Sequence, residues 1–274
     1  MTDRYAVMGN PIKHSKSPQI HRQFAKQLDQ DLDYQTMLVE LGGFVPAVTS
    51  FFAEGGRGLN VTVPFKQEAW QLAEDLSACA RLAGAVNTLY SDDQGRICGD
   101  NTDGVGMVRD LQVNHGVDLA NKNILILGAG GAVRGVLEPI LAVKPAALFI
   151  ANRTAEKAQQ LAADFAALGN ISGGGYPQLQ GAFDIVINGT SASLQGELPP
   201  LPDDLLAPGA CCYDMMYAAN PTPFMVWARD RGASQVMDGL GMLVEQAAES
   251  FRIWRGRQPE TKAVIATIRQ QLQG

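Results

Sequence analysis

The amino-acid sequence predicts an α/β protein with two domains. Its 274 residues are enough for two domains of ordinary size. Short apolar segments alternate with helical segments along most of the chain, and from about Asn123 the strands become continuously apolar. Such strands are typical of a parallel sheet that is covered on both faces. We therefore expect an N-terminal α/β domain followed by a doubly wound parallel sheet.

The N-terminal part is predicted to alternate strands and helices. Tyr5–Met8 is a short apolar strand, and Ser17 followed by Pro18 begins a helix, because serine is a good N-cap and proline is accepted in the first turn. Ile20, Phe24 and Leu28 give this helix a buried stripe. Strands follow at 34–39, 59–63 and 85–90, and helices at 44–54 and 66–75.

The C-terminal part alternates more regularly. Strands are predicted at 123–127, 146–151, 185–187, 211–215 and 235–237, with helices to about 141 and at 155–168 and 223–231. Two helices end the chain. The first has one apolar stripe and the second runs from about 260 to 272. Periodicity leaves open which domain these two helices cover. The stripe consists of Leu240, Leu243, Val244, Ala247, Phe251 and Trp254.

Composition excludes several classes of protein. The formal net charge is −6, which disfavours general nucleic-acid binding because that relies on dense positive charge. We expect no membrane span, since no run of 18 apolar residues occurs, and the N-terminus does not read as a signal peptide. The four cysteines lack C-x-x-C spacing and the histidines lack metal-site spacing, so we expect reduced thiols, no metal and a cytoplasmic location.

A glycine-rich turn follows the first strand of the C-terminal part. Gly128, Ala129, Gly130, Gly131 and Ala132 stand where a strand passes into a helix. Glycines there let the backbone approach a pyrophosphate, and the helix N-terminus offers free N–H groups. Val133 occupies the place of the third glycine in the G-x-G-x-x-G pattern, so the match is imperfect. The strand–turn–helix context nevertheless favours a dinucleotide site.

The next strand indicates which dinucleotide binds. Sites for NAD usually carry an acidic residue at the end of this strand, to accept from the ribose 2′-hydroxyl. Here the strand ends in Asn152, Arg153 and Thr154. A guanidinium suits a 2′-phosphate, and Lys157 in the first turn of the following helix opposes the helix dipole unless an anion is bound. The alternative is a solvated basic turn. We expect NADP.

Polar residues in the N-terminal part suggest a second ligand. Ser15 and Ser17 stand at a helix start, where an anion such as a carboxylate is favoured. Asn60 and Thr62 share one face of a strand, and Lys66 follows soon after. Two polar groups on one side of a half-buried strand suggest a hydrogen-bonding ligand. Asn87–Thr88 and Asn101–Gly104 add further polar turns.

These segments together resemble the NADP-dependent shikimate dehydrogenase family over nearly the whole chain. The resemblance implies a substrate-binding catalytic domain at 1–103, a Rossmann-like NADP-binding domain at 104–239, and C-terminal helices at 240–274 that return to the substrate domain. It also implies reduction of 3-dehydroshikimate to shikimate in aromatic amino acid (chorismate) biosynthesis. The matching segments are 9–11 with 15–18, 60–66, 84–88, 99–104, 128–132, 152–154, 214–217 and 238–247.

The resemblance assigns roles residue by residue. Lys66 matches the catalytic lysine and Asp103 its carboxylate partner. Ser15 and Ser17 match residues that bind the substrate carboxylate, with Tyr217 nearby. Matches to groups that bind the ring hydroxyls are Asn60, Thr62, Asn87, Asp103 and Gln246. Matches to cofactor-binding residues are Gly128, Ala129, Gly130, Gly131, Ala132, Asn152, Arg153, Thr154, Lys157, Thr190, Met215 and Gly239.

Two other functions stay open at this point. One is a quinate/shikimate dehydrogenase that uses NAD or NADP, which Arg153 disfavours. The other is a noncatalytic NADP-binding module on the same scaffold, which the presence of both Lys66 and Asp103 disfavours. We expect small-molecule ligands, no nucleic acid and no membrane partner, and a monomer or a homodimer.

Overall fold

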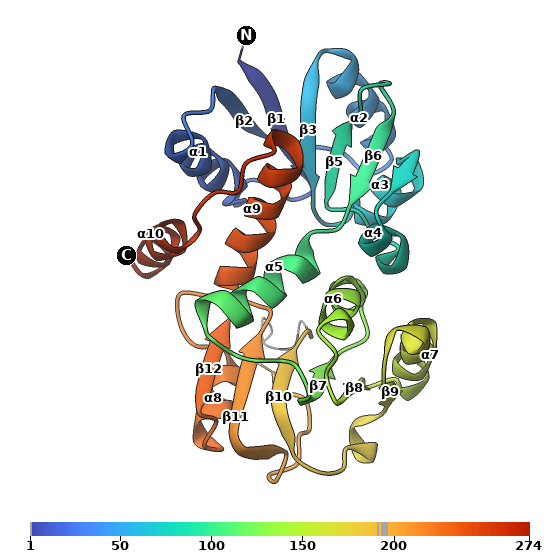
Figure 1. The fold of residues 1–274 in the computed structure, drawn as a ribbon, viewed down its shortest axis with the longest axis vertical. Coiled ribbons are helices and arrows are strands. Elements are labelled where there is room, and N and C mark those ends of the chain that lie inside the picture. Colours follow the sequence, from blue (N-terminus) through green and yellow to red (C-terminus); the bar gives the residue numbers. More distant parts are fainter. Residues whose placement is uncertain (1, 191, 193–196) are drawn as a thin grey trace. The chain divides into compact units, whose positions relative to one another are not determined.

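The computed structural model describes residues 2–190, 192 and 197–274. The chain forms two compact units, each built around a six-stranded sheet (Figure 1). The first unit comprises Met1–Gly106 and Val244–Val264, and the second comprises Met107–Leu243 and Ile265–Gly274. Helices cover both sheets, so the predicted α/β class is confirmed.

The first sheet has the strand order β2-β1-β3-β5-β6-β4. Neighbouring strands run parallel except β5, which is antiparallel to both β3 and β6. The ends of β1, β3 and β6 and the beginning of β5 therefore lie at one edge of the sheet. The strands are β1 (Asp3–Gly9), β2 (Leu32–Leu38), β3 (Gly56–Val61), β4 (Asp75–Leu76), β5 (Thr88–Ser91) and β6 (Ile97–Asp100).

Helices pack on this sheet through fully buried side chains, such as Phe24 and Phe44 on the helices and Leu59 on β3. They are α1 (Ser17–Gln27), α2 (Phe44–Ala53), α3 (Lys66–Leu72), α4 (Ala78–Ala83), the start of α5 (Asp103–Arg109) and most of α9 (Leu240–Arg255). One local prediction was wrong. Ser17 is the first helical residue rather than the N-cap, which is Lys16, and Pro18 lies in the first turn as expected.

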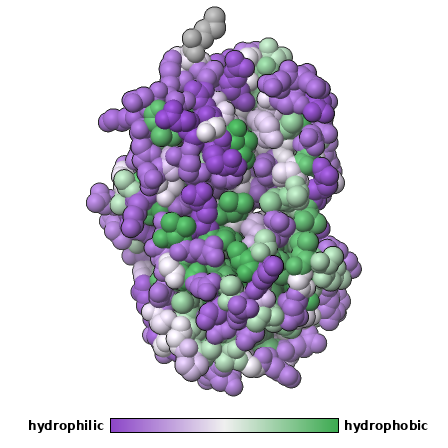
Figure 2. Space-filling view, viewed as in Figure 1, coloured by the Kyte–Doolittle hydropathy of each residue, from purple (hydrophilic) through white to green (hydrophobic). Residues whose placement is uncertain are grey.

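The surface of this unit is polar along its edge strand. β2 has a neighbour on one side only, and its central residues Gln35 and Thr36 are exposed. Figure 2 shows mostly hydrophilic residues over the region of β2 and α1. Polar side chains on an edge strand discourage pairing with further strands. Among the described residues, no helix is both long and apolar enough to cross a membrane.

The second sheet is entirely parallel, with the order β12-β11-β10-β7-β8-β9. The direction of winding reverses between β7 and β10, and ligands of open α/β sheets bind at such a switch point. The elements are β7 (Asn123–Leu127), α6 (Gly131–Ala142), β8 (Ala147–Ala151), α7 (Ala155–Phe165), β9 (Ile171–Gly174), β10 (Phe183–Asn188), β11 (Leu206–Asp214), α8 (Pro223–Asp230) and β12 (Gln235–Asp238).

The C-terminal helices divide between the units. Residues 244–264, which include most of α9, group with the first unit. Residues 265–274, which include most of α10 (Lys262–Gln273), group with the second unit. The reason is visible in Arg269, whose Nη1 donates to Oδ2 of Asp238 at 2.7 Å, at the end of β12.

A buried carboxylate joins the ends of β10 and β11. Asp214 is fully buried. Its Oδ1 accepts hydrogen bonds from Asn188 Nδ2 at 3.1 Å and from the backbone N–H of Met216 at 3.0 Å, and its Oδ2 accepts from the Thr222 hydroxyl at 2.5 Å. Buried polar groups need such partners, so Asp214 holds the ends of β10 and β11 together.

We expect Asp214→Ala to destabilise the protein by about 3 kcal/mol, because buried donors of Asn188 and Thr222 lose their acceptor. Urea unfolding followed by circular dichroism measures this change. Asp203→Ala is the matched control: the Asp203 side chain is 85% exposed and pairs with Arg231 on the surface, so its loss should cost under about 1 kcal/mol. Equal stability of the two variants would contradict the assigned role of Asp214.

Candidate active site

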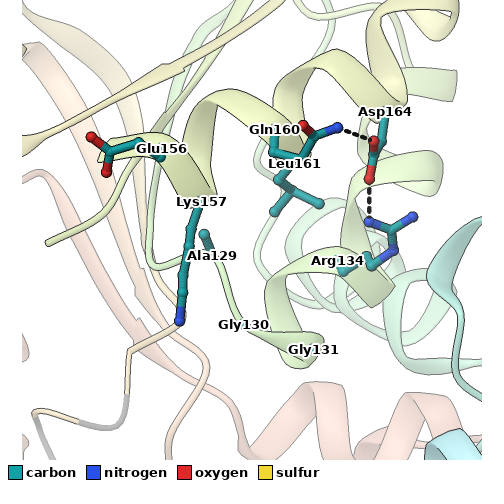
Figure 3. A pocket seen from close by; sticks show the side chains of 9 residues that line it. All are labelled: Ala129, Gly130, Gly131, Arg134, Glu156, Lys157, Gln160, Leu161 and Asp164. Carbon is teal, nitrogen blue, oxygen red and sulfur yellow. Dashed lines mark hydrogen bonds and ion pairs between the residues drawn. The ribbon is translucent and has the colours of Figure 1, made fainter. Parts of the chain in front are cut away.

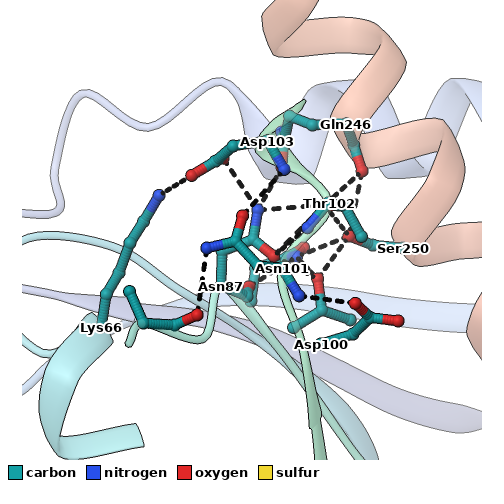
Figure 4. A network of polar contacts seen from close by, with 11 residues as sticks. Lys66, Asn87, Asp100, Asn101, Thr102, Asp103, Gln246 and Ser250 are labelled. Atoms are coloured by element: carbon teal, nitrogen blue, oxygen red, sulfur yellow. Dashed lines mark hydrogen bonds and ion pairs between the residues drawn. The ribbon is translucent and has the colours of Figure 1, made fainter. Parts of the chain in front are cut away.

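A lysine–carboxylate pair stands at the carboxyl edge of the first sheet. Lys66 begins α3 and Asp103 begins α5, so both side chains come from helix starts that follow strands. The Lys66 amine donates to Oδ2 of Asp103 at 2.5 Å (Figure 4). The side chains are 32% and 14% exposed, respectively. The pair is thus sheltered, but a ligand can still reach the amine.

Asn87 connects this pair to the sheet. It precedes β5 and is 2% exposed. Its Nδ2 lies 2.8 Å from Oδ1 of Asp103 and 3.0 Å from the Thr102 hydroxyl, and its Oδ1 accepts from the backbone N–H of Thr102 at 2.9 Å. The carboxylate of Asp103 therefore has a fixed orientation, with one oxygen toward Lys66 and the other toward Asn87.

Gln246 reaches the same group from α9. Its Oε1 lies 3.3 Å from Nδ2 of Asn87, and its backbone carbonyl accepts from the Thr102 hydroxyl at 3.0 Å (Figure 4). The helices α5 and α9 approach closely at Gly106, where an added Cβ would lie 2.6 Å from the backbone nitrogen of Gln246. A glycine at 106 is therefore required for this approach. Sequence patterns gave no sign of that requirement.

Asn60, which the resemblance assigns to a ring hydroxyl, is also held within the protein. It is only 6% exposed, and both ends of its carboxamide are bonded within the protein. Its Oδ1 accepts from the Tyr34 hydroxyl at 2.7 Å, and its Nδ2 donates to the Asn87 carbonyl at 3.2 Å and to the Ser250 hydroxyl at 3.0 Å. The Asn60 carboxamide is thus nearly buried and held in a fixed orientation.

Ser15, Ser17 and Thr62 complete the polar edge of the first unit. Ser15 Oγ accepts from the backbone N–H of Ser17 at 3.3 Å, so it helps to hold the start of α1. Thr62 follows β3 and is half-buried, and its methyl group packs where a side chain on Gly9 would otherwise lie. The loops after β1 and β3 therefore bring hydroxyl groups to the same sheet edge as Lys66.

In the second unit the glycine-rich turn lies between β7 and α6. Gly128 has a φ of +104°, which favours glycine. An added Cβ at Gly130 or Gly131 would meet no atom within 4 Å, so the backbone of this turn faces open space. A cavity of about 720 Å³ adjoins it. The lining includes Gly128–Ala132, Asn152, Arg153, Tyr176, Gly189, Thr190, Pro199 and Met216.

The buried Val133 explains the imperfect glycine pattern. It is fully buried and packs against Gly189, where an added Cβ would lie 2.4 Å from a Val133 methyl carbon. Gly189, at the end of the neighbouring strand, thus provides the room that a third glycine in the turn would otherwise provide. The turn therefore keeps its free N–H groups and its open face, which fits a pyrophosphate.

The basic residues predicted for the 2′-phosphate are exposed around this cavity. Arg153 lines it, while Asn152 Nδ2 donates to the backbone carbonyl of Thr154 at 2.9 Å. Thr154 is the N-cap residue of α7, although its side chain makes no capping bond. Lys157 extends from α7 toward Ala129 and lines an adjacent cavity of about 480 Å³ (Figure 3).

The other predicted residues of the second unit lie at strand ends. Thr190 lines the larger cavity. Met215 is 7% exposed, and Gly239 lies so close to it that a Cβ would be 2.2 Å from the Met215 carbonyl oxygen. Tyr217 is half-buried, and its burial raises the pKa of its hydroxyl. Sequence reasoning did not name Tyr176 or Met216 as lining residues: no motif marks Tyr176, and Met216 lies unassigned within the matching segment 214–217.

Comparisons with known proteins agree with these features. Residues 7–89 match the family model for the shikimate dehydrogenase substrate binding domain. Residues 111–195 match the model named shikimate / quinate 5-dehydrogenase, and residues 239–269 match the shikimate 5′-dehydrogenase C-terminal domain. The three matches follow one another along both units.

Individual relatives cover almost the entire chain. A shikimate dehydrogenase (NADP(+)) of Alkalilimnicola ehrlichii is 62% identical over 98% of this chain and 99% of its own. The crystal structure of an Ael1 enzyme from Pseudomonas putida has 48% identity, a TM-score of 0.92 and coverage of 99% and 98%. The shikimate 5-dehydrogenase of Thermus thermophilus, in complex with NADP(H) and shikimate, has 28% identity, a TM-score of 0.85 and coverage of 99% and 100%. The chain therefore belongs to the shikimate dehydrogenase family.

Proposed function

We propose that this protein is an NADP-dependent shikimate dehydrogenase that reversibly reduces 3-dehydroshikimate to shikimate. The observation that carries the proposal is the Lys66–Asp103 pair, held at 2.5 Å among buried polar side chains in a chain of this family. A binding module would have no need for a sheltered lysine in contact with a fixed carboxylate. The Lys66–Asp103 pair and the membership of this family together favour an enzyme that transfers a proton to or from a ring oxygen.

Lys66 is the proton donor in the direction of reduction and the acceptor in reverse. Its amine combines partial exposure with a fixed position. Asp103 orients the amine with one oxygen, because Asn87 holds the other at 2.8 Å. Orientation of this kind keeps the donor in line with the oxygen that gains the proton.

The remaining polar groups of the first unit hold the substrate. Thr62, Asn87, Asp103 and Gln246 bind ring hydroxyls, and Ser15 and Ser17 bind the carboxylate at the start of α1, with Tyr217 as a further contact. A helix start favours an anion, and α1 has no acidic residue in its first turn. Asn60 would also bind a ring hydroxyl, as the family resemblance implies, and its internal hydrogen bonds hold its carboxamide in place.

The residues of the second unit fit NADP. The open backbone at Gly130 and Gly131 would accept the pyrophosphate, and Arg153, Thr154 and Lys157, with Asn152, would hold the 2′-phosphate. Met215 and Gly239 would lie near the nicotinamide, which when bound supplies the hydride for the C3 carbonyl carbon. No acidic side chain stands at the end of β8, where NAD-specific sites usually carry one.

The cellular setting is part of the same proposal. The reaction belongs to aromatic amino acid biosynthesis through chorismate. All four cysteines are free thiols, which suits a reducing compartment such as the cytoplasm. We keep monomer or homodimer as the expected oligomeric state.

Quinate and NAD are the competing substrate and cofactor, and both can be compared with shikimate and NADP in one absorbance assay of reduced dinucleotide.

Lys66→Ala should lower kcat for shikimate oxidation by roughly 10²–10⁴-fold, because the general base is lost. Steady-state formation of NADPH measures this. NADP affinity, followed by fluorescence titration, should stay unchanged, since the cavity beside the glycine-rich turn is lined by second-unit residues alone. The exposed Lys26 provides the matched control Lys26→Ala, which should behave as wild type. Normal turnover in Lys66→Ala would remove Lys66 from the mechanism.

Arg153→Ala should raise the KM for NADP about 10- to 100-fold and leave the KM for NAD nearly unchanged. The physical reason is the loss of a charge-assisted hydrogen bond to the 2′-phosphate, which NAD does not carry. Arg229→Ala, which removes an exposed arginine of α8, is the matched control. An equal loss of affinity for both dinucleotides would place Arg153 elsewhere than at the 2′-phosphate.

A further inference from the structure

A buried polar cluster lies beneath the proposed substrate residues. It consists of His21 on α1, Tyr34 on β2 and Asn60 on β3. His21 and Tyr34 are fully buried and their rings stack, with centroids 4.3 Å apart and an angle of 7° between planes. His21 Nε2 lies 3.1 Å from Asn60 Oδ1, which also accepts from the Tyr34 hydroxyl at 2.7 Å. Two aromatic residues thus converge on one amide oxygen.

The hydrogen bonds determine how the Asn60 carboxamide is oriented. The carbonyl of Asn87, at 3.2 Å, is only an acceptor, so the group that faces it must be Nδ2. Oδ1 then faces His21 and Tyr34, and both must donate. The other ring nitrogen of His21, Nδ1, is buried without a hydrogen-bond partner among the described residues, so the proton belongs on Nε2. Only this arrangement gives both ends of the Asn60 carboxamide a suitable partner.

Burial keeps both donors in the required protonation states. The pKa of His21 is lowered to about 3 by desolvation, so its ring is neutral at any working pH. Burial raises the pKa of the Tyr34 hydroxyl well above its ordinary value, and a hydrogen bond with Ser17 opposes this shift. His21 and Tyr34 therefore remain hydrogen-bond donors to Asn60 across the working pH range.

A buried polar cluster contributes less to the free energy of unfolding than well-packed apolar side chains would. Burial of a polar group is costly unless its hydrogen bonds are complete, and apolar side chains of similar size fill such positions without that requirement. Asn60 also holds the segment that carries Asn87, whose side chain positions Asp103. A shift of the Asn60 carboxamide would therefore be transmitted through the Asn87 carbonyl to the Lys66–Asp103 pair.

We propose that Tyr34 and His21 are positioning residues for the reaction: they fix the Asn60 carboxamide, and Asn60 in turn fixes Asn87 against Asp103. This inference rests on the proposed function. The two residues touch neither substrate nor cofactor in this proposal. They act through Asn60.

The test compares two Tyr→Phe variants by steady-state kinetics with shikimate and NADP. Tyr34→Phe keeps the stacked ring and removes the hydroxyl, and should lower kcat/KM for shikimate about tenfold with a raised KM. Tyr5→Phe is the matched control. Tyr5 is 3% exposed on the same sheet, but its hydroxyl contacts Arg255. It should keep wild-type kinetics, and neither variant should change NADP affinity.

A double-mutant cycle with Asn60→Ala tests the route of the effect. If Tyr34 acts through Asn60, Tyr34→Phe should change kcat/KM little in the Asn60→Ala background. A full tenfold loss in that background would overturn the inference. A purely structural role predicts a different result: a lower kcat from less folded enzyme, with an unchanged KM for shikimate.

His21 supplies a second, independent pair of variants. His21→Gln retains a side-chain donor and should keep more activity than His21→Leu, which has none. Equal KM values for shikimate in the two variants would contradict the inference, and so would wild-type kinetics in Tyr34→Phe.

A wild type that binds NADP but does not oxidise shikimate would overturn the proposed function together with this inference, whereas an active wild type separates the two.

Discussion

Hydrogen bonding among buried polar side chains governs the first unit. Asn60, Asn87, Thr102 and Ser250 are nearly or fully buried and stand at strand ends or on α9. Each takes its hydrogen-bond partners from the others, so none can rotate without leaving another unpaired. Because the network is closed on its buried side, the orientations of Asp103 and Gln246 at its surface follow from it.

The same requirement explains why distant segments must meet at one edge. Ser250 Oγ lies 2.8 Å from the Thr88 hydroxyl and 3.0 Å from Asn60 Nδ2, which secures α9 to the sheet. Gln246 stands one helical turn before Ser250 on the same face. The glycine at 106 then allows α5 to approach α9, and the position of Gln246 beside Asn87 depends on both contacts.

Much of this arrangement could be predicted from the sequence, and the failures have physical reasons. The continuously apolar strands and the glycine-rich turn predict the parallel sheet and its dinucleotide-binding turn, because both signals are local. The hydrogen bonds of Asn60 with Tyr34 and His21 were not apparent, since these partners lie far from it in the chain and periodicity carries no information on side-chain pairing. The grouping of residues 265–274 with the second unit could not be read from periodicity for a similar reason: it involves Arg269 and Asp238, which are charges on separate elements.

The charge distribution makes clear how an acidic protein can hold two anions. The net charge of −6 gives no general attraction for a carboxylate or a phosphate. In the first unit, Asp103 compensates Lys66, so anion binding falls mainly to the hydroxyl and N–H donors at the start of α1, where the N-cap residue is Lys16. In the second unit, Arg153 and Lys157 are exposed beside a turn with free N–H groups. Hydroxyl and N–H donors recognise a carboxylate by the directions of their hydrogen bonds. Exposed cations instead recognise the 2′-phosphate by its negative charge. Salt should therefore weaken binding at the second unit more than at the first, because exposed charges are screened and buried hydrogen bonds are not.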